Sequence, residues 1–277
     1  MAADQQAVQA VCECARCEGV GLYYDRTVEV GRFGQLRLCA CVESLCRCTG
    51  RTPYQYWDED SRRRPCPCGP YRRRLADTNA LFHQAEVPER YRWKFQDDFH
   101  RVAEDGTPIP QADPVMVELA GLIEVRQVPV RGYLLHGAPG SGKTLLGCIM
   151  LNELMLRWCR AGRFLNLSRK YFERLRDTYS EDSEHYGQTW QIMQELSAMP
   201  FLMLDDLGIQ RNTEWELEML YNLVDARYSD ERFTIITTNK PLEEIKEIAQ
   251  GRIYSRLIEM CKTVEMGSVD YRAHRTW

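Results

Sequence analysis

The sequence predicts an α/β fold, in which helices flank a parallel sheet, preceded by a small cysteine-rich domain. From about residue 130 onward, short apolar runs alternate with longer helical patterns. Nine of the 12 cysteines lie within residues 12–68. A chain of 277 residues exceeds the usual single domain of about 100–200 residues. We therefore expect a cysteine-rich domain at 1–75, a connector at 76–114 and the α/β domain at 115–277.

The elements of the expected α/β domain follow from the apolar pattern. Four short apolar runs have the composition of buried strands, namely Tyr133–His136, Phe164–Leu167, Phe201–Leu204 and Phe233–Thr237. Four longer stretches between them have helical periodicity, namely Thr144–Arg160, Arg169–Tyr179, Gln188–Leu196 and Glu214–Tyr228. Thr213 and Glu216 have the spacing of a capping box, which predicts where the last of these helices begins.

Charge and hydropathy exclude two classes of protein. The net charge of −4 argues against a uniformly basic nucleic-acid binder. Residues 1–75 carry 12 arginines and nine acidic residues, and the triplets Arg62–Arg64 and Arg72–Arg74 supply half of those arginines. Such triplets are typical of a solvated surface or of a site for nucleic acid or an acidic partner. Since no long apolar run and no signal-peptide pattern occurs, we expect a cytoplasmic protein without a membrane segment.

A glycine-rich loop directly follows the first expected strand and precedes the first expected helix. Its residues are Gly137, Ala138, Pro139, Gly140, Ser141, Gly142, Lys143 and Thr144, which fit G-x-x-x-x-G-K-[ST] at every position. Glycines let the backbone N–H groups surround phosphates, and the helix N-terminus favours an anion. The motif therefore predicts an ATP site, with Lys143 on the β and γ phosphates and the Thr144 hydroxyl on Mg²⁺.

Two further strand ends carry polar residues that such a site requires. The third expected strand ends in Asp205 and Asp206, about 60 residues after the loop. We interpret Asp205 as a Mg²⁺ ligand and Asp206 as the general base, a role that glutamate fills more often in P-loop proteins. Asn239 follows the fourth expected strand, where it can orient the attacking water. The alternative is that all three are ordinary turn residues.

The stretch from about Val87 to Arg272 resembles the DnaC/IstB family of AAA+ proteins, which includes bacterial replicative helicase loaders. The resemblance rests on motifs that occur in order along the chain, namely Val87-Pro-Glu-Arg-Tyr-Arg, Phe95-Gln-Asp-Asp-Phe, Leu204-Asp-Asp-Leu-Gly208, Thr213-Glu-Trp-Glu, Thr237-Thr-Asn239, Arg252-Ile-Tyr-Ser-Arg256-Leu and Asp270-Tyr-Arg272. It implies an AAA+ P-loop domain with ATPase activity.

The resemblance also implies roles for three arginines. Arg256 matches the arginine finger, which reaches the γ phosphate of a neighbouring subunit, and Arg252 lies one helical turn earlier as its support or substitute. Arg272 matches the second sensor arginine. For each arginine alone, a surface ion pair is the alternative. By analogy with the family, we expect a homo-oligomer that contacts single-stranded DNA.

The cysteines form four closely spaced pairs, which predicts a metal site. The pairs are Cys14 with Cys17, Cys39 with Cys41, Cys46 with Cys48 and Cys66 with Cys68. The first has the spacing C-x-x-C-x-G-x-G of DnaJ-like zinc modules. Eight thiolates suffice for two structural Zn²⁺ sites with four ligands each. Sequential and interleaved groupings both remain open, and Cys12 is an alternative to Cys14.

Three functions are compatible with these features. The first is a helicase loader in DNA replication, in which the zinc module captures the helicase and ATP controls assembly and DNA contact. The second is an IstB-like helper that acts with a transposase. The third is a zinc-based adaptor that binds ATP as a switch and barely hydrolyses it, which the presence of Lys143, Asp205, Asp206 and Arg256 disfavours.

Overall fold

The computed structural model describes residues 14–30, 33–102, 108–109, 112–124, 127–208 and 213–267. The chain divides into two compact units. Unit 1 comprises residues 1–83 with 156–159, and unit 2 comprises 84–155 with 160–277. Residue 75, the expected domain boundary, lies within a 16-residue helix, α2 (Gly69–Gln84). Within the described residues, no helix is both long and apolar enough to cross a membrane.

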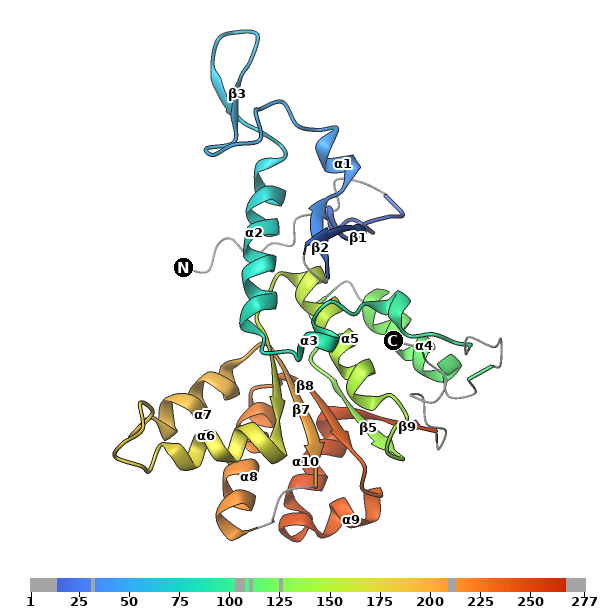
Figure 1. Ribbon diagram of the computed structural model, residues 1–277, viewed down its shortest axis with the longest axis vertical. Coiled ribbons are helices and arrows are strands. Elements are labelled where there is room, and N and C mark those ends of the chain that lie inside the picture. The colour runs from blue at the N-terminus through green and yellow to red at the C-terminus, as the bar shows by residue number, and fades with distance from the viewer. Residues whose placement is uncertain are drawn as a thin grey trace. The chain divides into compact units, whose positions relative to one another are not determined.

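Unit 1 contains two small antiparallel hairpins and a long helix (Figure 1). Its elements are β1 (Leu22–Val30), β2 (Phe33–Leu38), α1 (Ala40–Glu43), β3 (Gln55–Trp57), β4 (Arg63–Pro65) and α2. Its hydrophobic core is small and contains Val20, Leu22, Leu38, Val42, Tyr71 and two cysteines, Cys66 and Cys68. So few apolar side chains contribute little hydrophobic free energy, which indicates that the cysteines supply part of the stability.

Unit 2 is built on a five-stranded parallel sheet with the strand order β6-β7-β8-β5-β9. The strands are β5 (Gly132–Gly137), β6 (Gly162–Asn166), β7 (Phe201–Leu207), β8 (Phe233–Thr238) and β9 (Cys261–Met266). The helices that accompany them are α3 (Glu89–Arg92), α4 (Ala112–Glu124), α5 (Lys143–Trp158), α6 (Phe172–Asp177), α7 (Thr189–Ala198), α8 (Glu214–Ser229), α9 (Leu242–Glu247) and α10 (Arg252–Met260). This arrangement confirms the expected AAA+ P-loop fold.

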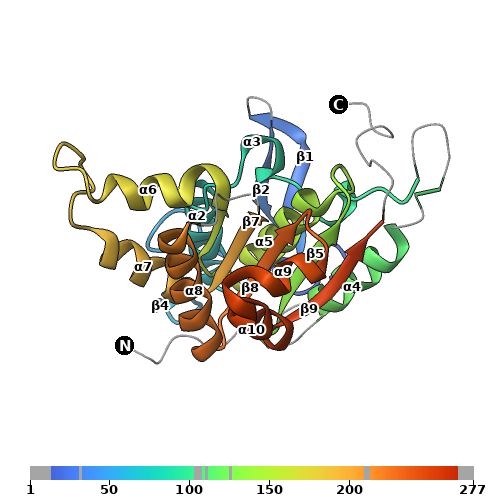
Figure 2. The same cartoon turned by 90° about the horizontal axis from the view of Figure 1, so that it is seen from below.

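Helices cover both faces of the sheet (Figures 1 and 2). On one face, Leu204 of β7 and Ile236 of β8 pack in a core with residues of α6, α7, α8 and α10. On the other face, α5 lies so close that a Cβ on Gly147 would meet the Met203 side chain at 2.6 Å. Because successive strand residues point to opposite faces, a strand covered on both sides has a continuous apolar run, as β7 does from Phe201 to Leu204.

Each of the four predicted strands is present, with bounds that differ by at most three residues. The capping box is confirmed, because the Thr213 hydroxyl accepts from the Glu216 amide at the start of α8. The helix expected at Arg169–Tyr179 is shorter than predicted. A π-helical turn at Leu167–Tyr171 precedes α6, and a π turn interrupts the α-helical hydrogen-bond pattern.

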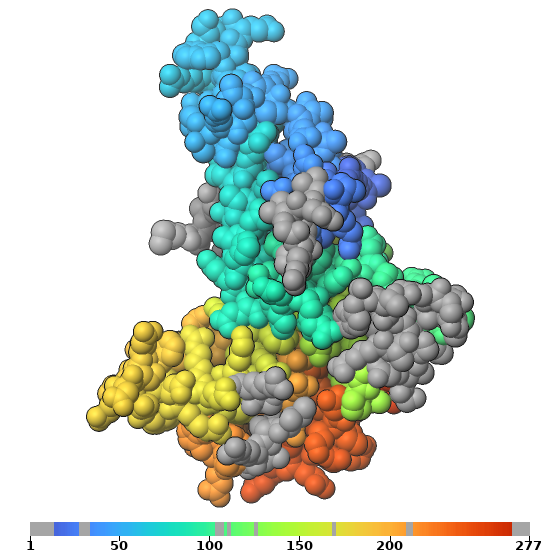
Figure 3. Space-filling model, viewed as in Figure 1, coloured from blue at the N-terminus to red at the C-terminus, as the bar shows by residue number. Residues whose placement is uncertain are grey.

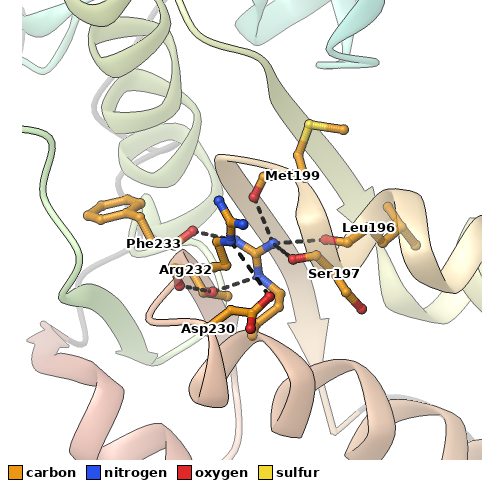
Figure 4. A network of polar contacts seen from close by, with 8 residues as sticks. Leu196, Ser197, Met199, Asp230, Arg232 and Phe233 are labelled. Carbon is orange, nitrogen blue, oxygen red and sulfur yellow. Dashed lines mark hydrogen bonds and ion pairs between the residues drawn. The ribbon is translucent and has the colours of Figure 1, made fainter. Parts of the chain in front are cut away.

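A buried arginine joins three elements on the α8 face of the sheet. Arg227 of α8 is fully buried, and its Nη1 donates to the carbonyl oxygens of Leu196, Ser197 and Met199 at the end of α7. Figure 4 shows these three residues within the network of polar contacts. Its Nη2 donates to the Phe233 carbonyl at 2.7 Å. Burial lowers the pKa of Arg227 to about 9, so the side chain is still cationic at neutral pH. The negative end of the α7 dipole stabilises this charge.

Arg227→Met should therefore destabilise unit 2 strongly. The change leaves four carbonyl groups without their donor, and loss of one member of a buried charged network costs about 3–5 kcal/mol. For a domain of this size, we expect the midpoint of thermal unfolding to fall by roughly 10 °C. Arg227→Lys keeps the charge but not the planar fork, so it should recover only part of the loss. An unchanged midpoint for Arg227→Met would contradict this role.

Candidate functional site

The glycine-rich loop connects β5 to α5, as the sequence predicts. Gly137 has φ +141°, and a Cβ there would meet the backbone oxygen of Met266 in β9 at 2.0 Å, so no larger residue fits. Lys143 is the first residue of α5 and is buried. Its Nζ donates to the carbonyl oxygens of Gly137 and Ala138 at 3.0 and 2.7 Å and to the Ser141 hydroxyl at 3.2 Å. The loop thus closes around the lysine ammonium group.

The two expected magnesium ligands are in direct contact. The Thr144 hydroxyl donates to Asp205 Oδ1 at 2.9 Å, although the two residues are 61 positions apart. The Thr237 hydroxyl of β8 donates to the same oxygen at 2.7 Å. This arrangement places a hydroxyl and a carboxylate, the hard oxygen ligands that Mg²⁺ prefers, side by side next to the phosphate loop. The donor set therefore fits a nucleotide-bound magnesium ion.

Asp205 is buried, and this burial has an electrostatic cost. Desolvation raises the pKa of Asp205 above its ordinary value, and the neighbouring Asp206 raises it further, against the hydrogen bonds from Thr237 and Thr144. A cation bound beside a buried carboxyl group stabilises its ionised form and so offsets the free-energy cost of its burial. Carboxyl groups whose pKa is shifted by burial and by a neighbouring like charge are common at functional sites.

Asp205→Asn should stabilise the protein and inactivate the site at once. A raised carboxyl pKa means that the folded chain holds its proton more tightly than the unfolded chain, so this group's contribution to stability falls as pH rises above the ordinary aspartate pKa. Asparagine removes the charge, and we expect a gain of about 0.5–2 kcal/mol at neutral pH. Thermal unfolding without nucleotide and magnesium-dependent ATP hydrolysis are the two measurements. Asp206→Asn is the control, because Asp206 is less buried; equal stabilisation by both changes would contradict the argument.

Asp206 lies next to Asp205 in a conformation that is unusual for a non-glycine residue. Its φ is +66°, its amide donates to the Thr237 hydroxyl at 3.0 Å, and its Oδ2 accepts from Asn166 Nδ2 at 3.2 Å. Left-handed backbone of this kind is often found at functional sites. Asn166 and Thr237 were missed as functional residues from the sequence, although both are polar side chains near the carboxyl ends of buried strands.

Asn239 follows β8 directly and is half-buried. The preceding residue, Thr238, pairs with Leu207 of β7 and donates to its carbonyl oxygen at 2.7 Å. Since the strands are parallel, Asn239 lies at the same edge of the sheet as Asp205 and Asp206. In open α/β sheets, ligands bind at this edge. Its role as a sensor stays a prediction.

Arg256 is bound to α8 of its own chain. Its Nε donates to Asp225 Oδ1 at 2.5 Å and its Nη2 to the Tyr221 hydroxyl at 2.8 Å. The guanidinium also lies over the Tyr221 ring, at 4.8 Å from the centroid, and Arg252 lies over the same ring at 4.6 Å. Asp225 and Tyr221 were not singled out from the sequence. Arg272 lies outside the described residues.

The eight expected zinc ligands form two groups, each drawn from consecutive pairs. The groups are Cys14, Cys17, Cys39 and Cys41, and Cys46, Cys48, Cys66 and Cys68. Neighbouring sulfur atoms lie 3.4–3.8 Å apart. Four thiolates around a zinc ion with bonds of about 2.3 Å have sulfur separations of about 3.8 Å, whereas a disulfide requires about 2.05 Å. The donor sets therefore fit two zinc ions in the sequential grouping; Cys12 lies outside the described residues.

The second group receives donors from its own module. The Arg47 amide donates to Cys66 Sγ at 3.2 Å, and the Gly50 amide donates to Cys48 Sγ at 3.3 Å. Arg72 Nε lies 3.4 Å from Cys68 Sγ. Such donors stabilise thiolates, which are the form of cysteine that binds metal.

Part of the chain is similar in sequence to known proteins. The chain is 28% identical over 128 residues to the replicative helicase loader DnaC of Escherichia coli (strain K12), which covers 46% of this chain and 50% of DnaC. It is 26% identical over 143 residues to the phage-like element PBSX protein XkdC of Bacillus subtilis (strain 168), covering 50% of each chain. The chain thus spans about half the length of these curated relatives.

Solved structures share the fold. A crystal structure of the DnaC helicase loader superimposes with a TM-score of 0.55 at 21% identity, covering 65% of this chain and 99% of that one. The structure of AMPPCP-bound DnaA from Aquifex aeolicus superimposes with a TM-score of 0.51 at 15% identity, covering 65% of this chain and 51% of the DnaA chain. The family model of IstB-like ATP binding proteins matches residues 110–276, which include the whole phosphate loop and both aspartates. The chain therefore belongs to the family of IstB-like ATP-binding proteins of the AAA+ class.

Proposed function

We propose that this protein is an ATP-hydrolysing loader of a replicative helicase, which acts in the cytoplasm during DNA replication. The single observation that carries the proposal is the assembled site of Lys143, Thr144, Asp205 and Asp206 in a chain whose relatives include helicase loaders. ATP binding would control assembly of the protein on its helicase and its contact with single-stranded DNA.

Each residue of the site has a task in phosphoryl transfer. The loop amides and Lys143 would bind the β and γ phosphates, and Thr144 and Asp205 would hold Mg²⁺, which supplies positive charge to the phosphate oxygens. Asp206 would accept a proton from the attacking water as general base. Asn166 would orient Asp206 through their 3.2 Å hydrogen bond, and Asn239 would position the water.

Assembly would complete the site. Arg256 would serve as the arginine finger of the next subunit's site, with Asp225 and Tyr221 fixing the direction of its guanidinium group. A cation that is supplied by a neighbour stabilises the transition state only after oligomerisation, so hydrolysis would depend on assembly. The two Zn²⁺ ions would be structural, because a site with four cysteine ligands has no open position for a substrate.

A second candidate is a transposition helper that works with a transposase. The observation that favours it is the family match, since the family is described as IstB-like over residues 110–276. Both candidates use the same ATP site and differ in the partner that the protein binds. The ATP site therefore cannot separate them, but a binding experiment can.

The test combines partner capture with turnover. The full chain is immobilised and incubated with a hexameric replicative helicase or with a transposase, each with ATP and with no nucleotide, while ATP hydrolysis is measured with and without single-stranded DNA. A loader should retain the helicase in an ATP-dependent manner and hydrolyse ATP faster with DNA, and Lys143→Ala should abolish both effects. Retention of the transposase alone would favour the second candidate. ATP binding without turnover under every condition would identify a nucleotide switch and refute both.

A further inference from the structure

The second cysteine group supports a hairpin whose tip projects from unit 1 (Figures 1 and 3). β3 and β4 pair antiparallel, with Tyr56 opposite Arg64 and Trp57 opposite Arg63. The base of the hairpin is fixed at the cysteines, since the Cys66 amide donates to the Tyr54 carbonyl at 2.8 Å. A metal-supported hairpin of this kind presents its side chains on a rigid backbone.

One face of the hairpin presents an exposed aromatic ring beside an arginine. Trp57 is 63% exposed, and the Arg63 guanidinium lies 5.1 Å from its ring centroid. An exposed tryptophan ring offers a large flat surface on which another ring can stack. On the opposite face of the hairpin, Tyr56 is half-buried, and the Arg47 guanidinium group lies 5.6 Å from the centroid of its ring.

The segment that contains this ring carries a net positive charge, whereas the hairpin itself, residues 55–65, has three arginines and three acidic residues. Residues 44–75 contain eight arginines and three acidic residues, which gives a net charge of +5 in a chain whose total is −4. The three acidic residues are consecutive, at 58–60 in the turn of the hairpin. The Asp58 carboxylate already accepts three hydrogen bonds. Its donors are the backbone amides of Asp60 and Arg62 and Nε of Arg64, the last at 2.7 Å. Arg62 and Arg63 are exposed beside Trp57.

From this geometry we propose that the β3–β4 hairpin binds single-stranded nucleic acid, with a base stacked on Trp57 and phosphates on Arg62 and Arg63. Exposed aromatic rings within a basic surface are the usual platform for single strands, because every base has a face that can stack. A duplex hides those faces, so its affinity for the hairpin should be lower. Contacts with phosphates and stacking on a base face do not distinguish one base from another, because sequence is recognised at the base edges. Binding should therefore depend little on nucleotide sequence. This site is separate from the ATP site, and it does not rest on the proposed function.

The test is the affinity of the whole 277-residue chain for a labelled oligothymidylate, measured by fluorescence anisotropy at several salt concentrations. Trp57→Ala should weaken binding about tenfold, which lies within the range for losing one stacked base. Trp57→Phe keeps a ring and should retain most of the affinity. Arg63→Ala should lower the slope of log affinity against log salt by about 0.7. Arg64→Ala is the matched control, because the charge of Arg64 is already neutralised by Asp58; it should change the slope less.

Two controls keep this proposal distinct from the proposed ATPase. The affinity for oligothymidylate is measured without nucleotide, so the state of the ATP site does not affect the outcome. Zinc content of the Trp57→Ala protein, measured in parallel, should equal that of the wild type and thereby exclude unfolding of the module. Wild-type affinity of Trp57→Ala for oligothymidylate would overturn the proposal. Loss of helicase capture by that variant without loss of DNA affinity would assign the hairpin to a protein partner instead.

Discussion

Arg256→Ala should lower ATP hydrolysis on the order of a thousandfold while ATP binding is retained. The magnitude is that of losing an arginine finger, whose positive charge stabilises the transition state far more than the bound substrate. The measurements are steady-state hydrolysis at saturating ATP and the dissociation constant of a fluorescent ATP analogue. Arg252→Ala is the matched control, since Arg252 lies one turn earlier on α10 and stacks on the same Tyr221 ring. It should hydrolyse ATP near the wild-type rate.

A mixing experiment decides whether Arg256 acts between subunits. Lys143→Ala and Arg256→Ala should each be inactive alone, because one lacks the phosphate-binding lysine and the other lacks the finger. In a random mixed assembly, an interface is complete when an intact loop from one variant meets an intact Arg256 from the other. Equal mixing should therefore restore roughly a quarter of the wild-type rate. Inactivity of the mixture, despite formation of mixed oligomers, would show that Arg256 does not complete a neighbour's site.

The ATP site was largely predictable because each of its parts lies at the end of a strongly apolar strand. The loop after β5 and the two aspartates of β7 are local signals, and parallel strands bring their carboxyl ends to one edge of the sheet. Thr237 was harder to identify, since a threonine in a strand is common and its bond to Asp205 depends on tertiary structure.

The last strand and the partners of the arginines were not predicted for physical reasons. β9 is an edge strand with exposed polar positions, such as Lys262, so it lacks the continuous apolar pattern of the central strands. Arg227 and Arg256 are both arginines in helical segments, and nothing in their neighbouring residues indicates that one is fully buried and the other paired across two helices. The contacts of long charged side chains depend on elements distant in sequence.

The grouping of the cysteines also required the structure. Four pairs permit several arrangements, and connectivity does not follow from spacing alone. β1 and β2 pair antiparallel and bring Leu22 opposite Leu38, which places the pair Cys39 and Cys41 next to Cys14 and Cys17. β3 and β4 do the same for the second group, because Cys66 directly follows β4. The hairpins thus determine the sequential grouping.

Cys66→Ser should remove about one of two zinc ions per chain and unfold the second cysteine module. The core of unit 1 contains few aliphatic side chains, and structural zinc contributes about 10–16 kcal/mol to the folding of small metal-binding peptides. Loss of one thiolate removes much of that free energy, and the β3–β4 hairpin has too few strands to be stable alone. Zinc per chain, measured by mass spectrometry of the metal, should fall from two to about one. Limited proteolysis should then cleave near the hairpin.

Cys159→Ser provides the control that separates metal loss from loss of any thiol. Cys159 is half-buried in unit 1 and belongs to neither group, so this variant should keep both zinc ions. Cys17→Ser should remove the other zinc ion and leave the hairpin resistant to protease, because the two groups share no ligand. If Cys17→Ser and Cys66→Ser each released both ions, the two cysteine groups would bind zinc cooperatively. The expectation that each group holds its zinc ion independently of the other would then be wrong. If neither changed the zinc content, the cysteines would not hold zinc, and the stability of unit 1 would have to come from its small hydrophobic core alone.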